Sequence, residues 1–183
     1  NRLLQGDVGS GKTVVAAVAL FVAARNQKQA AFLVPTEILA EQHFLYLHQY
    51  LKPLGLEAVL LTSGMDKKVL QQNREALADG TAQIAIGTHA LLEKLVVFRK
   101  LGLIVVDEQH KFGVQQRALL RQKGHNPDVL VMTATPIPRS LALTMYGDLD
   151  VSTIRELPPG RKAVKTLKVK ELGLKESILT KTL

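Results

Sequence analysis

Short apolar runs alternate along the chain with longer segments of mixed character. The apolar runs occupy residues 2–5, 30–34, 58–61, 83–86, 101–106 and 128–132 and are continuous or nearly so. Such runs are typical of strands that are buried on both faces of a sheet. Helical patterns cover segments 12–25, 36–51, 67–78, 112–123 and 137–146, most of them followed closely by a glycine. The alternation predicts an α/β fold in which helices cover both faces of a mostly parallel sheet.

A stretch containing two prolines and a glycine, LPPGRK at residues 157–162, interrupts this alternation. We therefore expect one domain over residues 1–157. Residues 158–183 would form a linker and the cut start of a second domain, with a strand over 163–169 and a helix from 173. Because the chain also begins only five residues before its first motif, we expect a fragment that is truncated at both ends.

The composition excludes several classes of protein. Hydrophobic residues make up 46% of the chain and charged residues 22%, which is typical of a globular domain rather than a disordered one. There is no cysteine, so disulfides and thiolate zinc sites are excluded. No uncharged apolar stretch is long enough to span a bilayer. Of the net charge of +8, residues 161–183 carry +5, so the excess charge indicates a solvated tail rather than a nucleic-acid groove.

The segment GDVGSGKT at residues 6–13 fits the phosphate-binding pattern G-x-x-x-x-G-K-[ST]. It follows a predicted strand and opens a predicted helix, so backbone N–H groups of residues 8–13 can surround a phosphate chain. Lys12 would reach the β- and γ-phosphates, and the Thr13 hydroxyl would bind Mg²⁺. The predicted nucleotide-binding residues are Gly6, Asp7, Val8, Gly9, Ser10, Gly11, Lys12 and Thr13.

An apolar strand at residues 101–106 delivers two adjacent carboxylates at its carboxyl end, where ligands bind in open α/β sheets. Side chains alternate along a strand, so Asp107 and Glu108 would have different roles. We expect Asp107 to hold Mg²⁺ and Glu108 to orient and deprotonate the attacking water. Together with Lys12, these two residues are the predicted catalytic groups of an ATP or GTP hydrolase.

Two further features are weaker. The strand at residues 128–132 runs into Thr133 and Thr135, small hydroxyl residues that could bridge the site to a neighbouring domain, although taken alone a plain strand-to-helix turn explains them better. None of the five histidines pairs with another at the spacing of a catalytic zinc site. We therefore expect the histidines to lie at the surface or to have their hydrogen bonds satisfied. His110 is the exception, because it follows the acidic pair Asp107 and Glu108.

Taken in order, these segments resemble the motifs of the first RecA-like domain of superfamily-two helicases. The matching strings are GDVGSGKT, PTEILAEQH (35–43), GTHALL (87–92), DEQHKFGVQQR (107–117) and TATPIPR (133–139). With TMYGDLDVSTIRELPPGR after them, they are similar to the RecG family of bacterial branch-migration helicases over nearly all of residues 1–162. Transcription-repair coupling translocases share the first and last strings but typically have Glu where this chain has Gln109.

The resemblance implies roles that the residues alone do not. It implies ATP and Mg²⁺ as cofactors and a RecA-like fold. Gln109 and His110 would couple the nucleotide state to a second domain and to DNA, and Thr133 and Thr135 would link hydrolysis to unwinding. Two further threonines fall in motifs that contact DNA phosphates in the family, namely Thr36 and Thr88.

The resemblance also implies partners and a location. We expect branched DNA (forks and Holliday junctions), a second RecA-like domain and an N-terminal DNA-binding domain in the same protein, and a bacterial cytoplasmic location. Because the family's arginine finger comes from the second domain, residues 1–183 alone should be nearly inactive. The alternatives are a duplex DNA translocase of the coupling type, a nucleotide-dependent binding module without unwinding, and, more weakly, a small-molecule P-loop kinase.

Overall fold

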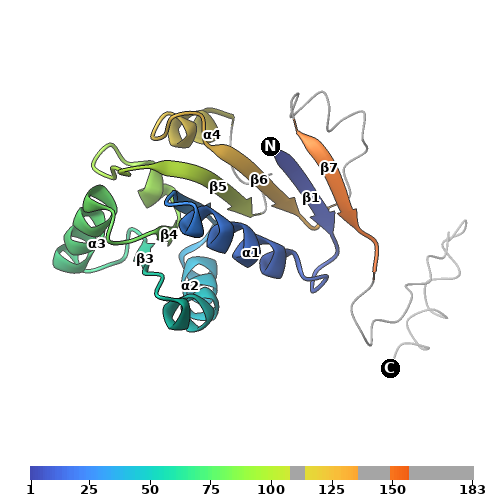
Figure 1. Ribbon diagram of the computed structural model, residues 1–183, viewed down its shortest axis with the longest axis horizontal. Helices are drawn as coiled ribbons and strands as arrows, with labels where there is room; N and C mark the ends of the chain where they lie inside the picture. Colours follow the sequence, from blue (N-terminus) through green and yellow to red (C-terminus); the bar gives the residue numbers. More distant parts are fainter. Residues whose placement is uncertain (108–113, 136–148, 157–183) are drawn as a thin grey trace, which may run out of the picture.

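The computed structural model describes residues 1–107, 114–135 and 149–156, which form one parallel sheet with helices on both faces (Figure 1). In chain order the elements are β1 (Arg2–Gly6), α1 (Lys12–Arg25), β2 (Gln29–Leu33), α2 (Glu37–Leu51), the 3₁₀ helix η1 (Lys52–Leu54), β3 (Ala58–Leu61), α3 (Lys67–Asp79), β4 (Ile84–Gly87), the 3₁₀ helix η2 (His89–Leu92), β5 (Leu101–Asp107), α4 (Val114–Arg121), β6 (Asp128–Thr133) and β7 (Asp150–Ile154).

The seven strands lie in the order β3-β4-β2-β5-β6-β1-β7, and every described pairing is parallel. Figure 1 shows β7 beside β1 at one end of the sheet, and β3 and β4 at the other. Because the strands are parallel, the carboxyl ends of β5, β6 and β1 meet along one edge. This edge carries the P-loop after β1 and the acidic end of β5.

Two apolar cores lie on the two faces of the sheet. On one face, α1 contributes Ala16 and Leu20, and α2 contributes Ala40 and Leu47. On the other face lie Leu77 of α3, Leu91 of η2 and Leu120 of α4. Strands β2 and β4 are buried at every residue, because helices cover both of their faces. This explains why those strands are continuous apolar runs.

Local capping explains where the helices begin and end. The Thr36 hydroxyl accepts a hydrogen bond from the Leu39 N–H at 3.3 Å and caps α2. The Asp66 carboxylate accepts from the Lys68 and Val69 N–H groups at 2.9 and 3.2 Å and caps α3. That helix ends at Gly80, whose φ of 87° lies in the left-handed region that glycine adopts readily. No helix among the described residues is long and apolar enough to cross a membrane.

The predicted mostly parallel α/β sheet is confirmed, and the helix predicted over 12–25 has those bounds. One strand was missed. β7 contains only exposed and half-buried residues at the edge of the sheet, so it lacks the continuous apolar run of the inner strands. The helix predicted over 137–146 and the linker and second-domain start predicted over 158–183 lie outside the described residues.

Candidate nucleotide-binding site

A cleft of about 330 Å³ lies at the carboxyl edge of the sheet, over the ends of β1, β5 and β6. Its walls bring together residues that are more than a hundred positions apart in the sequence. The lining residues are Val8, Gly9, Gly11, Lys12, Thr13, Val14, Tyr46, Asp107 and Ala134. The P-loop and the carboxylate at the end of β5, predicted from separate motifs, therefore share one cleft.

The shape of the P-loop depends on its glycines. Gly9 and Gly11 have φ angles of 79° and 93°, in the region that residues other than glycine rarely adopt. Gly6 leaves little room for a side chain, because a Cβ there would lie 2.5 Å from the Ser10 Oγ and 3.1 Å from the Ile154 Cβ. The Ser10 N–H donates to the Asp7 carbonyl at 3.1 Å, which closes the turn. The loop is thus compact and opens directly into α1.

The Lys12 side chain lies folded over this loop. Its ammonium donates to the carbonyl oxygens of Gly6 and Asp7 at 2.7 and 2.8 Å, and the residue is partly buried. An ammonium group has three donors, so it can exchange a carbonyl for a phosphate oxygen without leaving the loop. Its position fits the predicted role as the cation on a bound phosphate chain.

The donor set of the cleft fits Mg²⁺. Magnesium is usually held by one or two protein oxygens, with substrate phosphates and water completing its octahedron. Thr13 and Asp107 line the same cleft and offer a hydroxyl and a carboxylate. Among the described residues no group of three or more His, Cys, Asp or Glu side chains could hold a metal alone. In the arrangement usual for Mg²⁺, oxygens of a bound nucleotide and water would complete its coordination here.

Two residues of α2 reach this site: His43, which ends the string PTEILAEQH but was assigned no role from the sequence, and Tyr46, which lies outside the matched strings. The Nε2 of His43 lies 3.4 Å from the Oδ2 of Asp107, and the ring of His43 packs on Phe32 with centroids 4.9 Å apart. One turn later, Tyr46 lines the cleft. Their spacing of three places them on one face of a helix, but only the packing of α2 shows that this face looks toward the P-loop.

The predicted threonines lie at the same edge of the sheet. Thr36 is exposed, with its hydroxyl engaged in capping α2, whereas Thr88, just after β4, is only 5% exposed. Thr133 is buried, and its hydroxyl accepts from the Thr135 N–H at 3.1 Å, so these two residues form a local turn. The predicted roles of Glu108, Gln109 and His110 fall outside the described residues.

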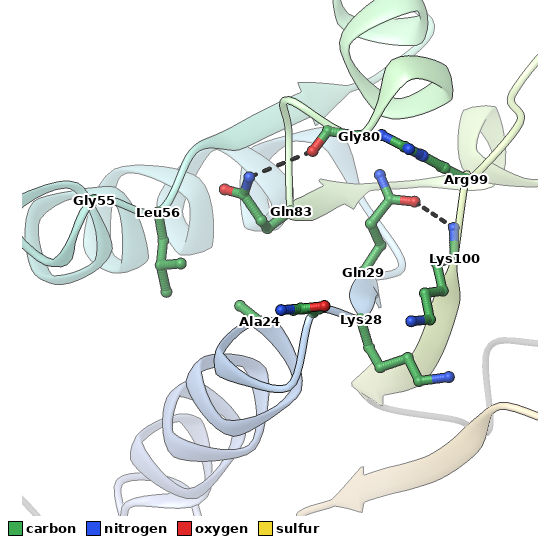
Figure 2. Close-up of a pocket in the computed structure, with 10 residues that line it drawn as sticks. Ala24, Lys28, Gln29, Gly55, Leu56, Gly80, Gln83, Arg99 and Lys100 are labelled. Atoms are coloured by element: carbon green, nitrogen blue, oxygen red, sulfur yellow. Dashed lines mark hydrogen bonds between the residues drawn. The ribbon is translucent and has the colours of Figure 1, made fainter.

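A larger cavity of about 520 Å³ lies at the opposite edge, where the central strands begin (Figure 2). Its polar lining includes three glutamines, Gln27, Gln29 and Gln83, together with the basic residues Lys28, Arg99 and Lys100. Gln29 bonds to the Lys100 N–H and Gln83 to the Gly80 carbonyl, so their amides are used to join the segments that enter the sheet. This cavity does not adjoin the P-loop and is separate from the candidate site.

A parallel sheet with a P-loop after β1 and an acidic end on β5 defines a RecA-like nucleotide-binding domain. The chain belongs to the DEAD/DEAH box helicase family, which matches residues 1–144. It is similar to the ATP-dependent DNA helicase RecG of Streptococcus pneumoniae serotype 4, with 57% identity over 170 residues that span 93% of this chain and 25% of the relative. RecG of Bacillus subtilis is 54% identical over 170 residues, with the same shares.

Solved structures agree with this assignment. A structure of RecG bound to a three-way DNA junction matches with a TM-score of 0.78 and 43% identity, over 99% of this chain and 24% of that one. A structure of yeast Dbp5 bound to RNA, at 21% identity and a TM-score of 0.66, covers 82% of this chain and 41% of the other and shows the shared fold. The predicted resemblance to the RecG family is confirmed. The chain spans about a quarter of the length of the curated relatives it matches.

Proposed function

We propose that this chain is the ATP-binding motor domain of a DNA helicase that couples ATP hydrolysis to branch migration and unwinding of forks and Holliday junctions. One observation supports this above the others: a P-loop whose lysine and threonine share a cleft with Asp107, in a chain 43% identical to a RecG whose structure holds a three-way junction. The proposal includes a bacterial cytoplasmic setting.

In this proposal the P-loop, residues 6–13, holds the phosphates of ATP. Lys12 neutralises the charge that develops on the γ-phosphate, and Thr13 and Asp107 hold Mg²⁺. Glu108 orients the attacking water, an assignment that rests on the motif alone. The metal, when bound, supplies charge neutralisation on the transferring phosphate.

The mechanical roles come from the family. Coupling of hydrolysis to movement would involve Gln109, His110, Thr133 and Thr135. Thr36 would lie near bound DNA phosphates, and the backbone beside Thr88 would also contact them. Residues 1–157 would form the motor domain and 158–183 the start of the next. The partners in the same protein would be a second RecA-like domain and an N-terminal DNA-binding domain.

A chimera tests the function directly. The matching 170 residues of Streptococcus pneumoniae RecG are exchanged for the corresponding residues of this chain, and ATP turnover and unwinding are measured on a three-way junction and on a linear duplex of equal length. We expect turnover stimulated by the junction and unwinding of its arms. Glu108→Gln in the chimera should abolish turnover and spare nucleotide binding.

The alternatives give different results in the same assay. Turnover that linear duplex stimulates equally, with no unwinding, would identify a duplex translocase and contradict the proposal. Nucleotide binding without turnover on either DNA would identify a binding module. The parent RecG, assayed in parallel, gives the turnover and unwinding expected of the protein before the exchange.

A further inference from the structure

One contact in the cleft joins two of the matched strings, PTEILAEQH and DEQHKFGVQQR, in a way that the motifs alone do not indicate. The Nε2 of His43 faces the Oδ2 of Asp107 at 3.4 Å, and both side chains are nearly buried, at 14% and 15% exposure. His43 belongs to α2 and Asp107 ends β5, so the contact joins two elements that are 64 positions apart in the sequence. We propose that His43 is a positioning residue, which holds the Asp107 carboxylate in the orientation that receives Mg²⁺. This inference rests on the proposed function.

The imidazole of His43 is itself held in place. Its ring packs on Phe32 with centroids 4.9 Å apart and planes tilted by 44°. Phe32 is fully buried in β2, and its Cα pairs with that of Val105, two residues before Asp107 on the neighbouring strand. The aromatic ring that supports the imidazole and the carboxylate that it faces therefore lie on adjacent strands. This arrangement limits where the Nε2 can go.

A carboxylate at a strand end would otherwise be free to rotate. Asp107 is the last residue of β5 and lines the cleft with Thr13. Groups that contact a metal ligand fix its orientation, and their loss typically lowers metal affinity or activity about 10- to 100-fold. Within residues 1–107, 114–135 and 149–156, His43 of α2 is a polar neighbour that contacts this carboxylate from another element.

The same helix has a second connection to the edge of the sheet. At its N-terminus Thr36 caps the helix, and the Glu37 carboxylate accepts from the Ser63 and Gly64 N–H groups at 2.9 and 3.1 Å. One turn after His43, Tyr46 lines the cleft. A displacement of α2 would therefore move the Thr36 end and the contact with Asp107 together, since both belong to one continuous helix.

Binding measurements test the positioning role without relying on turnover. Nucleotide affinity is measured by calorimetry on the 183-residue chain, with Mg²⁺ and with EDTA, for wild type, His43→Ala and His43→Gln. We expect His43→Ala to lose about 10- to 100-fold in affinity for Mg-nucleotide and little in EDTA. His43→Gln should retain most of the affinity, because its amide can also donate to the carboxylate.

A matched control and a double mutant distinguish loss of the His43–Asp107 contact from general damage to the fold. His48 lies on the same helix and packs on Phe44 rather than at Asp107, so His48→Gln should bind Mg-nucleotide like wild type. In an Asp107→Ala background, His43→Ala should cause no further loss. In the chimera, His43→Ala should raise the Mg²⁺ concentration for half-maximal turnover and leave kcat at saturating Mg²⁺ nearly unchanged.

The results that would overturn the inference are distinct from those that would overturn the function. Wild type that does not bind Mg-nucleotide contradicts the proposed function itself. Wild type that binds, with His43→Ala binding equally well, overturns only the positioning role. An equal loss in EDTA, or an equal loss in His48→Gln, also overturns it, because either would indicate damage to the fold rather than to the Asp107 carboxylate.

Discussion

The stability of the sheet should depend on one buried amide far from the nucleotide cleft. Gln29 opens β2 and is 5% exposed. Its Nε2 donates to the carbonyl oxygens of Leu77 and Ala82, each at 2.8 Å, and its Oε1 accepts from the Lys100 N–H at 2.9 Å. Figure 2 shows this amide between the chain segments that enter the sheet. One side chain thus satisfies three backbone groups from two other parts of the chain.

Replacing it with leucine keeps the volume and removes all three bonds. A buried backbone group without a partner costs about 1–3 kcal/mol. The Leu77 carbonyl retains a longer bond from the Arg99 N–H at 3.4 Å, and the leucine adds some apolar burial. We therefore expect Gln29→Leu to lower the free energy of unfolding by roughly 2–4 kcal/mol, which is below the simple sum over three groups.

Gln83 provides a matched control. Its amide also makes three bonds, to the Gly80 and Thr81 carbonyls at 3.4 and 2.8 Å and from the Glu57 N–H at 2.8 Å, but its surroundings are largely exposed. Water can replace those partners, so Gln83→Leu should cost less than about 1 kcal/mol. Urea unfolding of the three proteins at one pH measures both values. Equal losses in the two variants would refute the reasoning, because burial would then not decide the cost.

Three other outcomes are expected. Lys12→Ala should weaken nucleotide binding about 10- to 150-fold by calorimetry, since it removes a charge-assisted phosphate contact; unchanged affinity would contradict this. The Thr81 N–H and hydroxyl hold the pKa of Asp79 below its ordinary value of 3.8. The ionised carboxylate therefore stabilises the fold above pH 3.8, and this stabilisation is lost as the pH falls through the pKa of the folded state. Asp79→Asn should therefore flatten the acid limb of urea midpoints measured against pH, and an unchanged limb would argue against it. The chain alone should release phosphate barely above background and without DNA stimulation. Lys12 is the one cation among the described residues lining the cleft, and an arginine finger adds roughly 10³–10⁵ in rate. Robust DNA-stimulated phosphate release would contradict this prediction.

Local sequence was sufficient for the parts of this fold that local forces set. Helix α1 begins and ends where its pattern predicts, and the loop before it needs its glycines whatever surrounds it. The inner strands were predicted because burial on both faces requires continuous apolar runs. The P-loop and Asp107 could be proposed as site residues for a similar reason: phosphate and metal chemistry accept few residue types at fixed spacing.

Contacts between residues that are distant in the sequence could not be predicted from local patterns. β7 was missed because an edge strand needs only half of its residues apolar, so its pairing with β1 depends on the rest of the sheet. The strand order that brings the ends of β1 and β5 to one cleft follows from how the helices pack on each face. In the sequence alone, His43 looks like an ordinary helical histidine. Its contact with Asp107 appears only when α2 packs against β2 and β5, because a contact across 64 residues is determined by packing rather than by propensity.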